Sequence, residues 1–159
     1  MPPPLLIDLH KVDLNATLID KTRIYTEFLP HRHEFGVLDG ICFADVERMQ
    51  MVAYADVHVD DWWVRGHVPG RPLLPGVLML EMAAQTAAVL AKLVGGLTGF
   101  IGFGGIDECR FRETVVPPDR LHILAVGRDQ RPRRIVSATQ GFAHGKQIFE
   151  ARVTGLMME

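Results

Sequence analysis

The stretch GHVPGRPLLPGVLMLEMAAQ, residues 66–85, places one histidine in a loop and then runs into a strongly apolar segment. Three prolines, Pro69, Pro72 and Pro75, follow His67 and restrict the backbone of the loop, so this loop is partly ordered before the chain folds. Glu81 is the only ionisable residue in the second half of the stretch. Burying a carboxylate without a partner costs free energy or forces it to hold its proton. The stretch therefore predicts a buried helix with one carboxyl group that needs either a partner or a function.

The apolar segment continues as a predicted helix over about residues 77–94, and the glycines at 95 and 96 end it. The polar residues that interrupt it are Glu81, Gln85, Thr86 and Lys92. A membrane span would seldom tolerate that set, so we expect a core helix and no membrane span. A helix that is apolar on nearly every side needs partners all round, and a curved sheet wrapped around it would supply them.

Runs of β-branched and aromatic residues on both sides of this helix predict the strands of that sheet. Two strands are expected within residues 36–59, and a strand bent by its glycines is expected over 100–116. Three more strands are expected after a turn at Pro117 and Pro118. Their ranges are 121–128, 134–142 and 147–157, with a tight turn at 144–146.

The N-terminal part predicts a short helix over residues 13–29, with Asp13 or Asn15 as its cap and Pro30 as its end. We expect residues 1–28 to be an extension that covers one edge of the sheet and residues 29–159 to be a single domain. The fold class is therefore α+β: a curved antiparallel sheet around one long apolar helix, which is the hot-dog arrangement. An open sheet edge would favour pairing with a second copy of the chain.

Composition and charge exclude several classes of protein. The formal charge of −2 and the absence of a basic stripe argue against a nucleic-acid surface, and RPRR at 131–134 is interpreted as a solvated turn. The N-terminus lacks the pattern of a secretory signal. Cys42 and Cys109 match no metal spacing, which predicts two reduced, buried thiols in a cytoplasmic protein. The histidines at 31, 33 and 58 lack acidic or thiolate partners at ligand spacing, so we expect no metal and no cofactor.

The residues near the helix start suggest acid–base chemistry. His67 is a titratable base, and Gly76 stands where unpaired N–H groups of a helix favour developing negative charge. Glu81 and Gln85 are four residues apart, so they share one face of the helix. Together they suit removal of a proton next to a carbonyl with acid-assisted loss of a β-hydroxyl. A simpler alternative is that Glu81 and Gln85 form a local polar pair at a sheet edge or dimer seam.

Three separated segments resemble the (3R)-3-hydroxyacyl-acyl carrier protein dehydratases of type II fatty-acid synthesis. Residues 66–85 resemble the family's His-Phe-Pro loop, its Pro-Gly-Val-Leu helix start, its glutamate and its Ala-Gln pair. LPHRHEFGVLDG (29–40) is similar to its Leu-Pro-His-Arg-x-Pro-Phe opening, and GIDECRFRETVVPPDRL (105–121) to its Ile-Asp-x-x-(Arg/Lys)-Phe-Arg segment. The likeness spans about residues 29–157 and keeps the family's order.

The resemblance implies the roles of individual residues. His67 matches the catalytic histidine, Glu81 the catalytic acid, and Gly76 the glycine whose N–H binds the thioester oxygen. The residues expected to contact the acyl substrate are Val68, Pro75, Val77, Gln85 and Phe103. A related dehydratase-isomerase branch carries aspartate at the position of Glu81, so plain dehydration is expected here. Arg65 and Arg71, which flank His67, are expected to bind the acidic acyl carrier protein.

The resemblance also implies a homodimer, often assembled three to a hexamer, in which the histidine and glutamate of one site come from different subunits. Departures from the pattern are Val68 for Phe, Glu34 for Pro, Thr114 for Pro and Pro118 for Gly. None removes a catalytic group, but Val68 changes the expected pocket wall. Two other functions stay open: a hot-dog thioesterase that directs water with a helix carboxylate, and a non-catalytic acyl-binding protein.

Overall fold

The apolar segment after the proline-rich loop forms the helix α2 (Gly76–Gly95) in the computed structural model, which describes residues 1–95 and 97–158. The predicted range of 77–94 is confirmed, and Gly96, the second glycine of the predicted stop, lies outside the described residues. Most of the helix between Met79 and Ala91 is buried. By length and composition α2 could cross a membrane, but more than half of its apolar stretch is buried inside the protein. This burial agrees with the predicted core helix.

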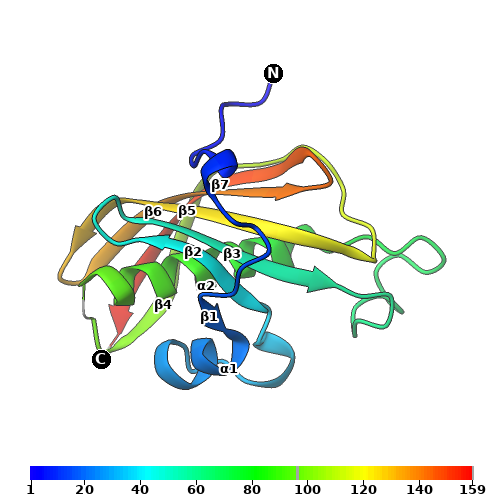
Figure 1. Ribbon diagram of the computed structural model, residues 1–159. Coiled ribbons are helices and arrows are strands. Elements are labelled where there is room, and N and C mark those ends of the chain that lie inside the picture. The colour runs from blue at the N-terminus through cyan, green and yellow to red at the C-terminus, as the bar shows by residue number, and fades with distance from the viewer. Residues whose placement is uncertain (96, 159) are drawn as a thin grey trace.

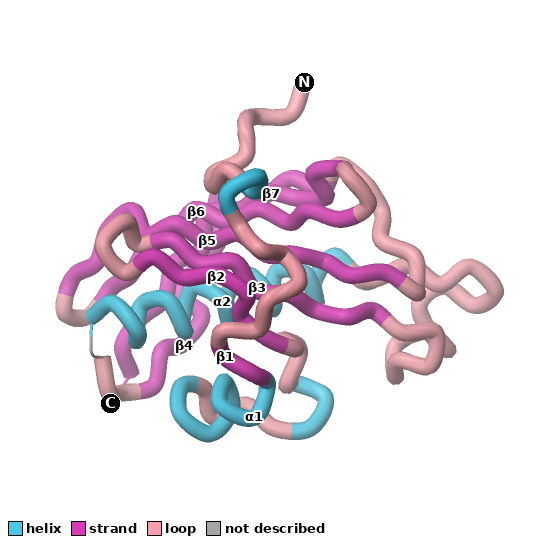
Figure 2. Tube along the Cα trace, viewed as in Figure 1, coloured by secondary structure: helices cyan, strands magenta, loops and turns pink. Residues whose placement is uncertain are grey.

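A seven-stranded antiparallel sheet curves around α2 (Figures 1 and 2). Its strands are β1 (Ile19–Asp20), β2 (Gly40–Asp45), β3 (Gln50–Val57), β4 (Phe100–Phe111), β5 (Asp119–Arg131), β6 (Arg134–Ala143) and β7 (Lys146–Met158). The order across the sheet is β1-β2-β3-β5-β6-β7-β4. The inner face packs on α2 and buries aliphatic side chains such as Ile123, Ile148 and Val153. The predicted α+β hot-dog class is confirmed.

The details of the strands follow the sequence pattern. Phe149, Ala151 and Val153 of β7 are buried, while the residues between them are partly or fully exposed. The turn between β6 and β7 consists of His144 and Gly145, whose φ angles of 39° and 77° are the positive values that a tight hairpin requires. In β4 the register shifts between Phe103 and Gly105, so the predicted glycine-associated irregularity is present.

The predicted helix over 13–29 is wrong in its first half. Only α1 (Lys21–Arg23) and the π-helical turn η2 (Ile24–Phe28) are helical, and Asp20 caps them by accepting a hydrogen bond from the Arg23 N–H. The residues that gave the apparent periodicity belong to two different layers. Leu14 packs against the outer face of the sheet, whereas Ile24 lies in the core beneath it. Helical spacing therefore arose without a continuous helix.

The N-terminal extension covers both an edge and a face of the sheet. β1 pairs with β2, as the predicted edge covering requires. Residues 5–14, which include the short 3-10 turn η1 (Leu9–Lys11), pack on the outer face against Cys42, Val52 and Leu124. The Leu6 N–H donates to Gln140 Oε1 of β6 at 2.8 Å. The extension thus forms a second small apolar layer, and the boundary at residue 28 stays a prediction.

The two cysteines differ. Cys42 is buried on β2, and its burial raises the pKa of the thiol to about 11. Cys109 is exposed, so its predicted burial is wrong. It lies in β4, at the end of the sheet, where a second register shift separates Asp107 from Arg110 and most side chains remain accessible. Both thiols are free.

Candidate active site

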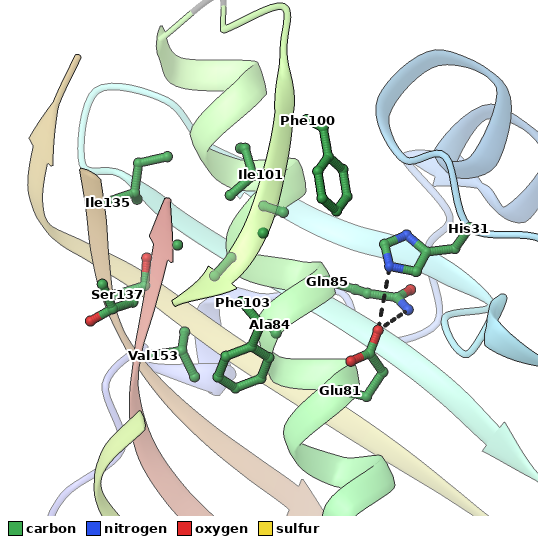
Figure 3. A pocket seen from close by; sticks show the side chains of 15 residues that line it. His31, Glu81, Ala84, Gln85, Phe100, Ile101, Phe103, Ile135, Ser137 and Val153 are labelled. Carbon is green, nitrogen blue, oxygen red and sulfur yellow. Dashed lines mark hydrogen bonds and ion pairs between the residues drawn. The ribbon is translucent and has the colours of Figure 1, made fainter. Parts of the chain in front are cut away.

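An apolar cavity of about 180 Å³ lies between α2 and the strands β4, β6 and β7 (Figure 3). Small α2 side chains form one wall, and the larger side chains of the strands form the other. The apolar lining residues include Ala84, Ala87, Ala88, Phe100, Ile101, Phe103, Ile135 and Val153. The run GFGG at residues 102–105 contributes Gly102 and Phe103 to the lining. An alkyl chain would find an apolar environment here.

Glu81 lies at this cavity rather than in the closed core. Its side chain is 23% exposed, and Oε1 lies 3.4 Å from His31 Nε2 and accepts a hydrogen bond of 2.8 Å from Gln85 Nε2. Gln85, one turn further along α2, is only 2% exposed. The carboxyl group therefore has polar partners and faces a space that a ligand could enter.

The loop between β3 and α2 holds His67 in a defined orientation. His67 N–H donates to the Trp63 carbonyl at 2.9 Å, and the ring Nδ1 lies 2.8 Å from the carbonyl oxygen of Leu73. A carbonyl oxygen can only accept, so Nδ1 donates, and the lone pair of the neutral ring is on Nε2. The residue is exposed, so Nε2 is available as a base.

Gly76 is the first residue of α2, and its environment is crowded. Pro75, which is buried, accepts hydrogen bonds from Leu78 and Met79 through its carbonyl group. A Cβ atom at Gly76 would meet the Phe111 ring at 2.9 Å, so a larger residue would displace that ring. The first N–H groups of a helix lack intrahelical acceptors and lie at its positive end. This position suits a donor to an oxygen that gains negative charge.

The isolated chain does not gather all the predicted site residues. Among the residues that the structure describes, the cavity lining includes Glu81, Gln85 and Phe103 but not His67 or Gly76. Of the other residues expected to bind substrate, Val68 and Val77 are exposed and Pro75 is buried at the helix start. The loop that carries His67 projects beyond the end of the sheet (Figure 1).

Two groups of exposed side chains flank these features. Arg65 and Arg71 are exposed on the His67 loop. The second group belongs to β4, which is an edge strand of the sheet. Its exposed apolar residues include Phe100, Phe103, Ile106 and Phe111. An exposed edge strand with apolar side chains is a surface on which another strand can pair.

Sequence reasoning missed Tyr25 and understated His31. From the sequence, His31 was considered as a metal ligand, whereas its ring Nε2 lies 3.4 Å from Glu81 Oε1. Tyr25 is buried, and its hydroxyl donates to Gln85 Oε1 at 2.7 Å. A signal was present, because a tyrosine that packs in an apolar cluster usually needs a partner for its hydroxyl.

A metal is not part of the described arrangement. Within residues 1–95 and 97–158, no three His, Cys, Asp or Glu side chains are grouped as metal ligands would be.

Comparisons with known proteins identify relatives of this chain. A family model described as a FabA-like domain matches residues 29–152. A 3-hydroxyacyl-[acyl-carrier-protein] dehydratase, FabZ, of Klebsiella pneumoniae is 40% identical over 130 residues, which cover 79% of this chain and 84% of that protein. The FabZ of Campylobacter jejuni is 33% identical over 147 residues and covers 89% of this chain and 99% of its own.

Solved structures share the fold at low identity. The dehydratase heterocomplex ApeI:P from Xenorhabdus doucetiae superposes with a TM-score of 0.72 at 15% identity, covering 89% of this chain and 92% of that one. A hypothetical thioesterase from Streptococcus pneumoniae, solved with coenzyme A, gives 0.54 at 12% identity, covering 69% and 78%. These two likenesses concern the fold alone. The length and identity of the FabZ matches, together with the family model over most of the chain, show that this protein belongs to the 3-hydroxyacyl-[acyl-carrier-protein] dehydratase family.

Proposed function

We propose that the protein dehydrates (3R)-3-hydroxyacyl thioesters of acyl carrier protein to trans-2-enoyl thioesters in fatty-acid or related lipid synthesis. The observation that carries this proposal is the position of Glu81, a carboxyl group on the core helix that faces an apolar cavity. Such a cavity would take the acyl chain, and the carboxyl group would meet its polar end. Family membership supplies the reaction class.

The chemistry assigns one step to each group. His67 Nε2 takes a proton from C2, and the C2–H electrons form the C2=C3 double bond. Glu81 gives a proton to the hydroxyl on C3, and the C3–O bond breaks to release water. The Gly76 N–H stabilises the negative charge that builds on the thioester oxygen. Both partners of Glu81 contact Oε1, which leaves Oε2 for the substrate.

The site requires two chains in this proposal. Glu81 faces the cavity beside β4, whereas His67 lies on a loop outside that cavity. Pairing of β4 with β4 of a second copy would continue the sheet, cover the exposed apolar side chains and bring the loop of one chain to the cavity of the other. A twofold dimer with two equivalent composite sites follows. Assembly of three dimers into a hexamer stays a prediction.

Substrate delivery and location complete the proposal. Val68, Pro75, Val77, Gln85 and Phe103 would surround the acyl thioester. Arg65 and Arg71 would contact the acidic carrier protein at the mouth of the site, because both are exposed beside His67. Two free thiols fit a reducing cytoplasm.

The test is an assay of the reverse reaction. We would add trans-2-enoyl thioesters with chains from about C4 to C16 and follow loss of the conjugated enoyl absorbance, while a thiol reagent reports thioester cleavage in the same sample. Hydration without thiol release supports the dehydratase. Thiol release without hydration would support the hot-dog thioesterase, and binding without either reaction would support an acyl-binding protein.

A further inference from the structure

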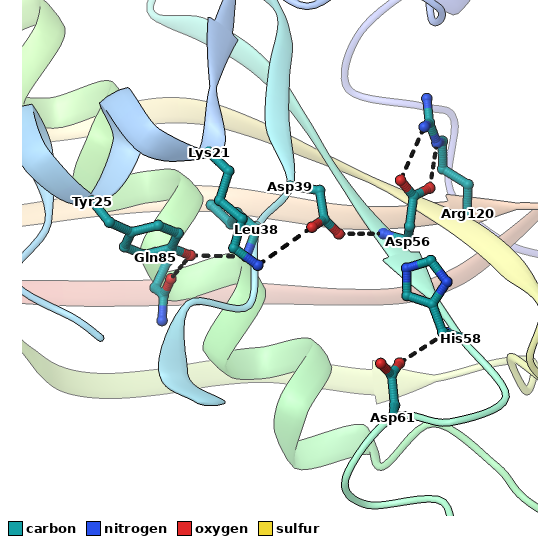
Figure 4. Close-up of polar contacts among 9 residues, drawn as sticks. All are labelled: Lys21, Tyr25, Leu38, Asp39, Asp56, His58, Asp61, Gln85 and Arg120. Carbon is teal, nitrogen blue, oxygen red and sulfur yellow. Dashed lines mark hydrogen bonds and ion pairs between the residues drawn. The ribbon is translucent and has the colours of Figure 1, made fainter. Parts of the chain in front are cut away.

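A directional chain of hydrogen bonds leads from the backbone of the N-terminal half to Glu81. The Leu38 N–H donates to the Tyr25 hydroxyl at 2.8 Å, and that hydroxyl donates to Gln85 Oε1 at 2.7 Å (Figure 4). Gln85 Nε2 in turn donates to Glu81 Oε1 and to the Phe35 carbonyl, each at 2.8 Å. Three hydrogen bonds therefore join a backbone amide to the proposed catalytic acid, and a fourth ties the Gln85 amide to the Phe35 carbonyl.

The direction of this chain is fixed by its two ends. The Leu38 N–H can only donate, and the Phe35 carbonyl can only accept. If the Gln85 amide turned over, its oxygen would face both that carbonyl and the Glu81 carboxyl group, and three acceptors would meet. The Tyr25 hydroxyl holds Oε1 on the opposite side and so selects the orientation in which Nε2 faces Glu81.

Water has little access to this chain. Tyr25 is 7% exposed and Gln85 2%. Burial raises the pKa of the Tyr25 phenol, so the hydroxyl keeps the proton that it donates. A buried donor or acceptor that loses its partner is costly, because water cannot replace the lost bond. The Gln85 amide is held by its contacts with Tyr25, Phe35 and Glu81.

We propose that Tyr25 is a positioning residue, which fixes the Glu81 carboxyl group through the Gln85 amide and makes the N-terminal extension part of the active site. The inference rests on the proposed function, because it needs Glu81 to act as the acid. Tyr25 belongs to η2, and this turn is anchored to the sheet by β1 and by the Asp20 cap. The extension thus does more than cover an edge: it supplies the group that orients the amide beside Glu81.

The experiment compares the two tyrosines of the chain, which are equally buried. Tyr25→Phe removes the hydroxyl that contacts Gln85. Tyr54→Phe is the matched control, because Tyr54 is also 7% exposed and its hydroxyl pairs with Thr17 Oγ1 at 2.7 Å in the outer layer. Both variants should lose thermal stability. Only Tyr25→Phe should lower kcat for hydration of a trans-2-enoyl thioester, by about tenfold, with KM changed less than twofold.

A double-mutant cycle separates positioning from general loss of structure. In a Glu81→Gln background the residual rate should not fall further when Tyr25→Phe is added, because the carboxyl group that Tyr25 orients is already gone. Equal losses in both backgrounds, or wild-type kcat in folded Tyr25→Phe, would overturn the inference. If Tyr25→Phe fails to fold, Gln85→Met breaks the same chain at its next link and must give the same loss of kcat and the same non-additivity.

Failure of the inference can be told from failure of the proposed function. An inactive Glu81→Gln beside a fully active Tyr25→Phe would overturn the inference alone. Full activity of Glu81→Gln would remove the catalytic role of Glu81, and the positioning role of Tyr25 with it.

Discussion

The two proposed catalytic side chains lie in opposite kinds of structure. Glu81 is on the core helix, 23% exposed, with polar contacts to His31 and Gln85. His67 is on an exposed loop, where backbone groups of the same loop hold the ring. The acid is therefore positioned by long-range packing, and the base by local backbone geometry. In the proposed two-chain site, each chain would supply the carboxyl group at its own cavity and the histidine loop at the cavity of a second copy.

Removing the base should have the largest effect on activity and almost none on stability. His67→Ala deletes a group worth roughly 10²–10⁴-fold in rate, so hydration of a trans-2-enoyl thioester should fall by that factor. The melting temperature should stay within about 2 °C, because the side chain is exposed. His58→Ala is the control, since His58 is an exposed histidine at the start of the same loop. Near-wild-type turnover by His67→Ala would remove the base from the mechanism.

Removing the acid should cost about a hundredfold in rate while preserving the fold. Glu81→Gln keeps the shape and the contact with Gln85 but cannot give up a proton, and loss of a partly buried carboxyl group should leave the melting temperature level or higher. Glu150→Gln is the matched control: Glu150 is 21% exposed and pairs with Arg112 at 2.6 Å. That variant should melt earlier and keep its turnover. If Glu81→Gln instead melts early and stays active, Glu81 and Gln85 are a structural polar pair.

A mixing experiment tests whether the His67 and the Glu81 of one site belong to different chains. Equal amounts of His67→Ala and Glu81→Gln chains, unfolded and refolded together, should pair at random, so roughly half of the dimers are mixed. A mixed dimer with composite sites has one site carrying both lesions and one carrying neither. Activity should then recover to roughly a quarter of the wild-type level, as measured by enoyl hydration. No recovery above the two parents would mean that both residues act within one chain.

The sequence predicts the core half of the molecule better than its outer layer. α2 is a long, nearly continuous apolar segment that glycines end, and β7 alternates buried and exposed residues over much of its length, so the ranges of both elements follow from the sequence pattern. The region 13–29 contributes to two layers, and its apolar spacing imitated a single helix. The exposure of Cys109 was missed because it depends on β4 lying at the end of the sheet, which a single strand pattern does not reveal.

The candidate site was likewise predicted from the sequence only in part. His67, Gly76 and Glu81 lie within one segment of fifteen residues, so this segment indicates the site by itself. The groups that orient Glu81 come partly from elsewhere: His31 reaches Glu81, and Tyr25 reaches Gln85, only through the packing of the N-terminal region on α2. Local pattern can propose the reacting groups, but the network that orients them depends on tertiary contacts.

The smallest expected effect concerns Arg71, which is exposed on the loop that carries His67. Arg71→Glu reverses a charge beside His67 without touching the reacting groups, so it should lower the association rate with an acidic carrier protein and make turnover more salt-sensitive. We expect kcat/KM for a carrier-bound substrate to fall about threefold, with a short pantetheine thioester turned over normally. Arg48→Glu makes the same change of charge at an exposed arginine in the β2–β3 turn and should affect neither substrate. Equal losses on both substrates would show that Arg71 orders the His67 loop, and the carrier surface would then have to lie elsewhere.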